Sequence, residues 1–448
     1  MKITELEIRD FNQFKDFKLD LTYPKGHPKE GKPLEKVCFI GQSGTGKTSL
    51  LRMIQEMTDD NDYYKHESEE QHEWMYLIRF AVKEYSLFIA KLKRDGRSRA
   101  IFVGADAQKV SNYFLSYPVK QIFYPAEYLD LVEPSQSLSN PLDYVSNDKE
   151  IQGRIDLERK EFEEKKSFEF GIDKPIEIWK HILSDSREYR IGETKYRLEI
   201  VNLLMKDADK THQLVEEFKN WKSENQSPIH SLAESLNPLL KEFNLRVSID
   251  FNFEKPEDFD FIKIETLNGQ NVPFGGWSTG TKQIVMTATP LFKLDTTNTV
   301  IMMDEPERSL YPDLQQKIIP YYSELAPEAQ FFYATHSPII ASCFEPWEVV
   351  ELEFGEDGFV QQKPYFTGER HVDNYHTDPR LLRWDSILSK MFDVEEEGND
   401  LRTEKLMELA MLESEIKKMK AEGADKSEIQ PKWEAYKKLA ELLDWKIN

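Results

Sequence analysis

One glycine-rich turn constrains the fold of this chain more than any other segment. Residues 41–48 read GQSGTGKT; an apolar run at 36–40 precedes them, and a segment of helical character, 48–57, follows. Such glycines let the backbone wrap a phosphate group with successive N–H groups, while the lysine reaches further phosphates and the threonine hydroxyl ligates Mg²⁺. The pattern therefore predicts a strand, a phosphate-binding loop and a helix. The predicted contact residues are Gly41, Ser43, Gly44, Gly46, Lys47 and Thr48.

A second apolar run ends in two acidic residues. Residues 300–306 read VIMMDEP, which predicts a buried strand followed by Asp304 and Glu305. In open α/β sheets, ligands bind at the carboxyl ends of the strands. Asp304 is the predicted partner of Thr48 in a magnesium site, and Glu305 is the predicted base that polarises an attacking water.

Two further segments carry polar groups at the ends of predicted elements. Residues 277–283, WSTGTKQ, place Ser278 and Gly280 at the start of a helix, where bare N–H groups and the helix dipole favour an anion. Residues 331–338, FFYATHSP, form a predicted strand that ends in His336. Histidine serves many roles in proteins, so a function can be assigned to His336 only from its position among the other motifs.

The order of these motifs resembles that of ABC-type ATPases, and the DEPE and THSP forms resemble the branch that includes SMC, RecF and OLD-type proteins. The resemblance implies ATP and Mg²⁺ as cofactors, catalysis by Lys47, Glu305 and His336, and a head-to-tail dimer. In such a dimer, Ser278 and Gly280 contact the γ-phosphate held by the opposite subunit. Trp277 and Thr281 depart from the residues common in this family.

Two further nucleotide contacts are less specific. Gln121, before an apolar strand and a Pro-Ala-Glu turn, is the candidate for the family's Q-loop glutamine, although a plain surface glutamine explains it equally well. Arg9 lies in IRDF, which resembles the opening strand of SMC and RecF heads, where a basic residue meets the nucleotide.

The resemblance implies an α/β fold: an ABC ATPase head with a mixed sheet, a P-loop core and antiparallel N-terminal strands. Four parts are predicted: an ATPase lobe at 1–146, a helical insertion at 147–230, a second ATPase lobe at 231–378 and a helical C-terminal region at 379–448. Alternating apolar residues in 1–22 predict two antiparallel strands.

Apolar stripes along 403–422 and 426–443 favour a helical hairpin closed on itself over an open docking surface. The stripe residues are Leu406, Leu409, Leu412, Ile416 and Met419, and Ile429, Trp433, Tyr436, Leu439 and Leu442.

Composition narrows the class of protein. The net charge is −22, from 59 basic and 81 acidic residues, which argues against a general polyanion binder. The two cysteines, Cys38 and Cys343, fit no metal or disulfide spacing and are expected to be buried. No apolar run approaches the length of about 18 residues that spans a bilayer, so we expect a cytoplasmic protein without a membrane partner.

The cellular role depends on a shorter match. Residues 381–393, LLRWDSILSKMFD, resemble a segment that follows the core of OLD-like ATPases in bacterial anti-phage systems of the Septu, PARIS and retron-associated kinds. Because no nuclease is recognisable here, we expect an ATP-hydrolysing sensor or regulator subunit that forms a homodimer or higher homo-oligomer and controls a separate effector, a nuclease. A nucleic acid or a phage protein would be its trigger. The alternative is a RecF- or SMC-like DNA-repair ATPase that clamps DNA by ATP-dependent dimerisation. A third interpretation, an interaction module with a dead ATP site, conflicts with the complete motif set.

Overall fold

The computed structural model describes residues 2–59, 74–82, 85–92, 98–101, 119–126, 141–171, 175–204, 206–250, 261–394 and 398–446. The chain divides into two compact units, residues 1–381 and 382–448. The first unit contains the sheet and every predicted nucleotide contact. The second unit is helical.

A 12-stranded sheet organises the first unit, in the order β6-β5-β4-β1-β2-β15-β14-β3-β13-β12-β7-β8. Its strands are β1 (Lys2–Phe11), β2 (Phe14–Asp20), β3 (Lys36–Gly41), β4 (Trp74–Val82), β5 (Tyr85–Leu92), β6 (Ser98–Ile101), β7 (Lys120–Tyr124), β8 (Ser167–Glu169), β12 (Thr299–Asp304), β13 (Gln330–Ala334), β14 (Val349–Phe354) and β15 (Val360–Lys363). The sheet is mixed, and the predicted α/β fold class is confirmed.

The strands from β14 to β8 run parallel. All six residues of β12 are buried, because a central parallel strand has both faces covered and is apolar throughout. β3 feeds directly into helix α1 (Lys47–Asp59), which packs against β7, β12 and β13. The glycine-rich turn and the ends of β12 and β13 therefore share one edge of the sheet.

The N-terminal strands pair antiparallel, as predicted: β1 lies between β2 and β4, and β5 pairs with β4 and β6. Apolar residues of β1, β2 and β4 form one core with residues of β3, β12 and β13. Ile3, Leu6 and Ile8 of β1 are fully buried, whereas Arg9 and Asp10 are exposed. Leu6 and Ile8 lie two residues apart, as a strand with one buried face requires, and a register shift between Ile3 and Glu5 accounts for the extra residue before Leu6.

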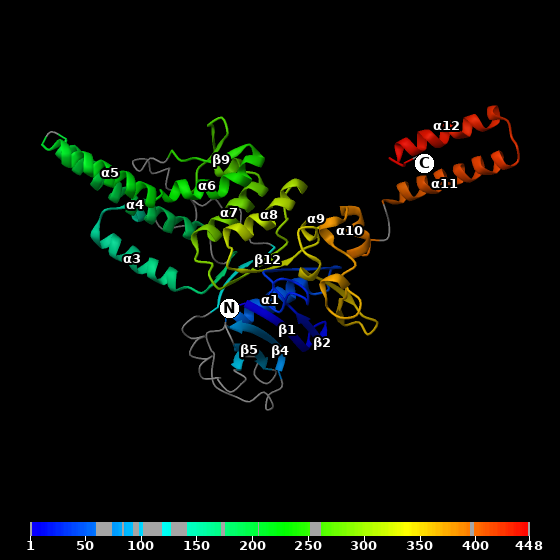
Figure 1. Ribbon diagram of the computed structural model, residues 1–448, viewed down its shortest axis with the longest axis horizontal. Helices are drawn as coiled ribbons and strands as arrows, with labels where there is room; N and C mark the ends of the chain where they lie inside the picture. The colour runs from blue at the N-terminus through cyan, green and yellow to red at the C-terminus, as the bar shows by residue number, and fades with distance from the viewer. Residues whose placement is uncertain are drawn as a thin grey trace. The chain divides into compact units, whose positions relative to one another are not determined.

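Helices of the first unit pack beside the parallel strands. Figure 1 shows α6, α7 and α8 side by side, and α4 and α5 as a hairpin. Their bounds are α3 (Lys149–Glu164), α4 (Pro175–Leu203), α5 (Ala208–Glu224), α6 (Pro228–Leu240), α7 (Thr279–Lys293), α8 (Pro312–Leu325) and α9 (Pro338–Ala341). A small antiparallel sheet of β9 (Leu245–Val247), β10 (Ile264–Thr266) and β11 (Asn271–Val272) completes the unit.

The interval predicted as wholly helical contains a strand. β8 lies between α3 and α4 and pairs with β7 at the edge of the main sheet. Glu169 of β8 accepts hydrogen bonds from Arg52 (2.6 Å) and Gln55 (2.6 Å) of α1. The interval therefore contributes a strand to the main sheet in addition to its helices.

The second unit contains α10 (Trp384–Met391), α11 (Asp400–Ala421) and α12 (Lys426–Leu442). The predicted closed hairpin is confirmed, since α11 and α12 bury Leu409, Ile416 and Tyr436 between them. The apolar stripe was wrong at one position: Leu442 is 75% exposed, and Leu443 is buried in its place.

Two other sequence predictions can be checked. Cys38 is fully buried, whereas Cys343 is only partly so. Within the described part of the chain, every helix is too short or too polar to cross a bilayer.

Candidate active site

The turn between β3 and α1 has the backbone of a phosphate cradle. Gly41 has a φ of 137° and Gly46 a φ of 85°, conformations that residues with a Cβ rarely adopt. A Cβ on Gly41 would lie 2.2 Å from the carbonyl oxygen of Leu352, and a Cβ on Gly46 would lie 2.6 Å from the Phe14 ring. Ser43 and Gly44 are exposed at the tip of the turn. The loop therefore opens its N–H groups and the N-terminus of α1 toward solvent, where an anion is favoured.

Lys47 is held by the loop that precedes it. Its Nζ donates to the carbonyl oxygens of Gly41 (2.8 Å) and Gln42 (3.0 Å). Burial lowers the pKa of Lys47 to about 8, against the opposing effect of Asp304 and Glu305. With this pKa the side chain is still mostly charged at pH 7, and an anionic ligand such as a phosphate group would raise the pKa again.

Thr48 and Asp304 meet across the end of β12. The Thr48 hydroxyl donates to Asp304 Oδ2 at 2.8 Å, and Asp304 is buried. Burial raises the pKa of the Asp304 carboxyl, while the Thr48 hydrogen bond and Lys47 oppose that rise. Two hard oxygen ligands fit Mg²⁺, which is bound by few protein oxygens and completes its shell with water and phosphate.

Glu305 and His336 lie beside this pair. Glu305 has a left-handed φ of 49°, and its N–H donates to the carbonyl oxygen of Ala334 at 2.8 Å, which ties β12 to β13. His336 follows β13 and is exposed. Burial is the main cause that lowers the pKa of His336, and the charge of Lys47 lowers it further. The charge of Glu305 raises it. The charges of Lys47 and Glu305 both act on the imidazole, and the neighbouring ends of β12 and β13 bring Asp304, Glu305 and His336 to one edge of the sheet with Lys47.

Glu307 was not predicted as a site residue, yet it braces the histidine segment. Its Oε1 accepts hydrogen bonds from the Thr335 hydroxyl (2.6 Å) and the His336 N–H (3.3 Å). Its Oε2 is buried without a partner. Burial raises the pKa of Glu307 to about 7. The second glutamate of the DEPE sequence is the signal that could have identified it.

Ser278 and Gly280 form a separate helix start. Ser278 caps α7, its Oγ accepting a hydrogen bond from the Thr281 N–H at 3.0 Å. Gly280 is buried, and a Cβ there would lie 2.9 Å from the carbonyl oxygen of Ser309. Among the described residues, no hydrogen bond or ion pair joins this turn to the loop at 41–48. Their contact with a nucleotide stays a prediction.

Gln121 is not at the site, and the prediction that it contacts the nucleotide was wrong. It is 1% exposed, donates to Ser167 Oγ at 2.8 Å and pairs in register with Val300. Asp304 lies at the other end of the same parallel pair of strands. A one-residue rise of about 3.3 Å places Gln121 about 13 Å short of that edge.

The β1–β2 hairpin does reach the phosphate loop. Gln13, which the sequence did not single out, donates through Nε2 to the carbonyl oxygen of Gly44 at 3.2 Å. Arg9 is exposed on the strand that leads to this hairpin. Its own contact with a nucleotide stays a prediction.

Comparison with known proteins gives one family match. A family described as "AAA ATPase domain" matches residues 1–341. No curated protein matches the chain. Among solved structures, the chain is similar to the Smc head domain bound to the C-terminal domain of ScpA from Pyrococcus furiosus, with 14% identity, a TM-score of 0.40 and coverage of 81% of this chain and 96% of that one. It is also similar to the SMC head domain from Thermotoga maritima, with 13% identity, a TM-score of 0.39 and coverage of 81% and 99%.

Proposed function

Because this chain belongs to the AAA ATPase domain family, we propose that the group around Lys47, Asp304 and Glu305 binds ATP with Mg²⁺ and hydrolyses it to ADP and phosphate. The observation that carries the proposal is the 2.8 Å hydrogen bond between Thr48 and Asp304, beside the buried Lys47. It joins the phosphate loop to an acidic strand end, which is the arrangement that nucleotide hydrolysis with a divalent ion needs.

Each residue has a role that its surroundings support. Lys47 exchanges its carbonyl partners for phosphate oxygens, and Thr48 and Asp304 supply the oxygens that hold Mg²⁺. Glu305 stands one residue beyond Asp304, where the left-handed turn directs it away from the strand, and it polarises the attacking water. His336 lies within the influence of both Lys47 and Glu305, and it contacts the terminal phosphate.

Two substitutions separate binding from chemistry. Lys47→Ala should lose ATP binding. Glu305→Gln should still bind ATP but hydrolyse it at least about a hundredfold more slowly, because it loses a general base. Binding is measured by equilibrium titration and hydrolysis by phosphate release, with the exposed Glu328→Gln as a control. Wild-type turnover by Glu305→Gln would refute the assignment of the base.

The Ser278–Gly280 turn supports an assembly of two copies. It lies at a helix N-terminus against the backbone of Ser309, with no bond to its own phosphate loop among the described residues. We propose that it completes the site of a second copy, so that ATP joins two chains head to tail.

The cellular role is a wider proposal. A cytoplasmic regulator ATPase in an anti-phage complex, acting through a separate effector nuclease, is supported by the resemblance of residues 381–393 and by a helical hairpin with its own core. The alternative, a clamp on duplex DNA, would need a basic surface that the charge of −22 does not favour. Purification from the native host with mass spectrometry, beside a duplex-DNA binding assay of the ATP-bound Glu305→Gln protein, tests both. A co-purifying nuclease supports the first role. ATP-dependent DNA binding with no protein partner supports the second.

A further inference from the structure

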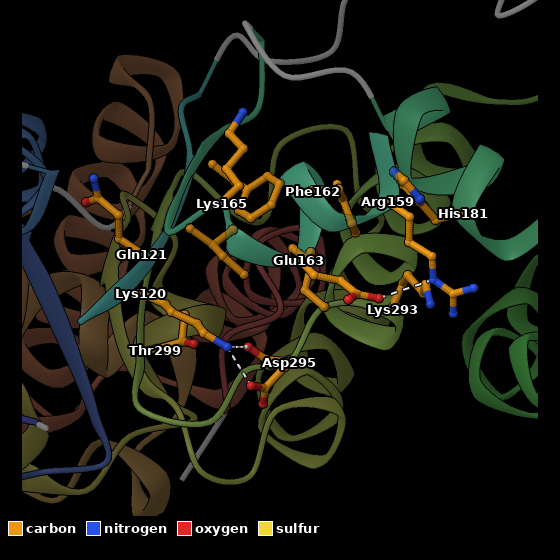
Figure 2. Close-up of a pocket in the computed structure, with 13 residues that line it drawn as sticks. Lys120, Gln121, Arg159, Phe162, Glu163, Lys165, His181, Lys293, Asp295 and Thr299 are labelled. Atoms are coloured by element: carbon orange, nitrogen blue, oxygen red, sulfur yellow. Dashed lines mark hydrogen bonds and ion pairs between the residues drawn. The ribbon is translucent and has the colours of Figure 1, made fainter. Parts of the chain in front are cut away.

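A pocket of ≈330 Å³ lies at the opposite end of the parallel strands from the proposed ATP site. Figure 2 shows the side chains that line it. Lys120 and Gln121 begin β7, and Thr299 begins β12, and all three line the pocket. Asp304 ends β12, five residues and about 16 Å away at the usual rise of a strand. The remaining walls come from α3, β8, α4 and the end of α7, so the predicted insertion closes a cavity against the ATPase sheet.

The floor of this pocket is apolar and aromatic. Ile122 and Phe168 are buried, and Phe162 stacks on His181 with ring centroids 3.9 Å apart. His181 is 6% exposed, and its Nδ1 is buried without a hydrogen-bond partner. Leaving such an atom unpaired is costly in free energy. Burial and the nearby Lys293 and Arg159 lower the pKa of His181 to about 4, which leaves the imidazole neutral at pH 7.

Basic side chains surround that floor. Arg159 and Lys293 lie together at one end, and Lys120 lies with Asp295 at another (Figure 2). These cations are already paired: Arg159 with Glu163, Asp185 and Glu188, and Lys293 with Asp185.

The pairing does not exhaust their donors. A guanidinium has five N–H groups and an ammonium three. The bonds of Arg159 use three N–H groups, to Glu163, Glu188 and Asp185, and that of Lys293 uses one. Two donors on each side chain therefore remain for a ligand. A flat apolar floor beside convergent donors is the usual composition of a small-molecule site, and the volume is in the usual range.

We propose that this pocket is a second ligand site, for a small molecule with a flat apolar ring and an anionic group, either a phosphate or a carboxylate. The ring lies against the aromatic floor, and the anionic group meets Arg159 and Lys293. The site is independent of the phosphate loop and does not rest on the proposed ATPase activity.

The test uses the full chain and four probes, with no nucleotide present. 1-Naphthyl phosphate and 1-naphthoate carry both features, whereas 1-naphthol lacks the charge and inorganic phosphate lacks the ring. We expect saturable 1:1 binding of at least one of the two complete probes, at least about tenfold tighter than either incomplete probe. A preference between them identifies the anionic group. Lys47→Ala, which alters only the phosphate loop, should leave the affinity unchanged within about twofold.

Two pocket variants make the test decisive. Lys293→Gln removes a positive charge, and Leu294→Trp fills the cavity. Each should weaken binding at least about tenfold. Lys160→Gln is the matched control, because Lys160 is 72% exposed on α3 and is not among the lining residues. Thermal unfolding and ATP titration show whether each variant is folded. The proposal is overturned if no probe saturates, or if both pocket variants bind as tightly as Lys160→Gln.

Discussion

Glu307 offers a quantitative test of how the active site is braced. Burial raises the pKa of its carboxyl from 4.5 to about 7. At about 1.4 kcal/mol per pKa unit, ionising this group costs about 3 kcal/mol more in the folded chain than in the unfolded one. The unfolded chain releases the proton near pH 4.5 and the folded chain only near pH 7. This contribution to stability is therefore complete below pH 4.5 and is lost as the pH rises to about 7.

The substitution Glu307→Gln removes the ionisation but keeps an oxygen that accepts from Thr335. Near pH 5 the variant should match the wild type within about 1 kcal/mol, the value of one hydrogen bond. Between pH 5 and pH 8 its free energy of unfolding should gain about 2–3 kcal/mol relative to the wild type. Because the comparison is a difference, other titrating groups, including Glu348, cancel.

Urea unfolding of both proteins at the two pH values, followed by tryptophan emission without nucleotide, measures this difference. Glu324→Gln, an exposed change on α8, is the control. Its free energy of unfolding should differ from that of the wild type by the same amount at pH 5 and at pH 8. If the difference in free energy of unfolding between Glu307→Gln and the wild type is also the same at both pH values, Glu307 ionises normally in the folded chain. The reasoning from its burial would then be wrong.

Three further outcomes are expected. Gly46→Ala should weaken ATP binding at least about tenfold by titration, since its Cβ would meet Phe14 and strain the loop; affinity equal to wild type would contradict this. ATP with Mg²⁺ should convert Glu305→Gln from monomer to dimer by light scattering, and the added change Ser278→Ala should weaken that dimer; a monomer under saturating ATP would exclude the head-to-tail assembly. Removing residues 400–448 should leave ATP binding intact, because the hairpin has its own core, but abolish association with the effector or the higher oligomer; an unchanged partner ratio in purification would show that the hairpin only packs.

The sequence alone determined the local parts of the site. The phosphate loop, the acidic strand end and the histidine strand each depend on short runs of residues whose backbone requirements are local. The motifs therefore placed five residues on elements that the structure confirms, while their roles in catalysis stay predictions: Lys47, Thr48, Asp304, Glu305 and His336. The closed hairpin of α11 and α12 was equally predictable, because two apolar stripes of helical period need each other.

The tertiary structure decided which residues meet. Gln121 and Asp304 lie on neighbouring strands, but only the register shows that they occupy opposite ends of the pair. Gln13 reaches Gly44 across 31 residues, and Glu307 reaches Thr335 across 28. No local pattern encodes such contacts.

The same reason explains β8 and the second pocket. Three residues between two long helices carry almost no strand signal, and β8 exists because the free edge of β7 binds its backbone. The pocket gathers side chains from β7, α3, β8, α4, α7 and β12. Periodicity reports which face of an element is buried. Only the packing of elements distant in sequence brings their side chains into one cavity.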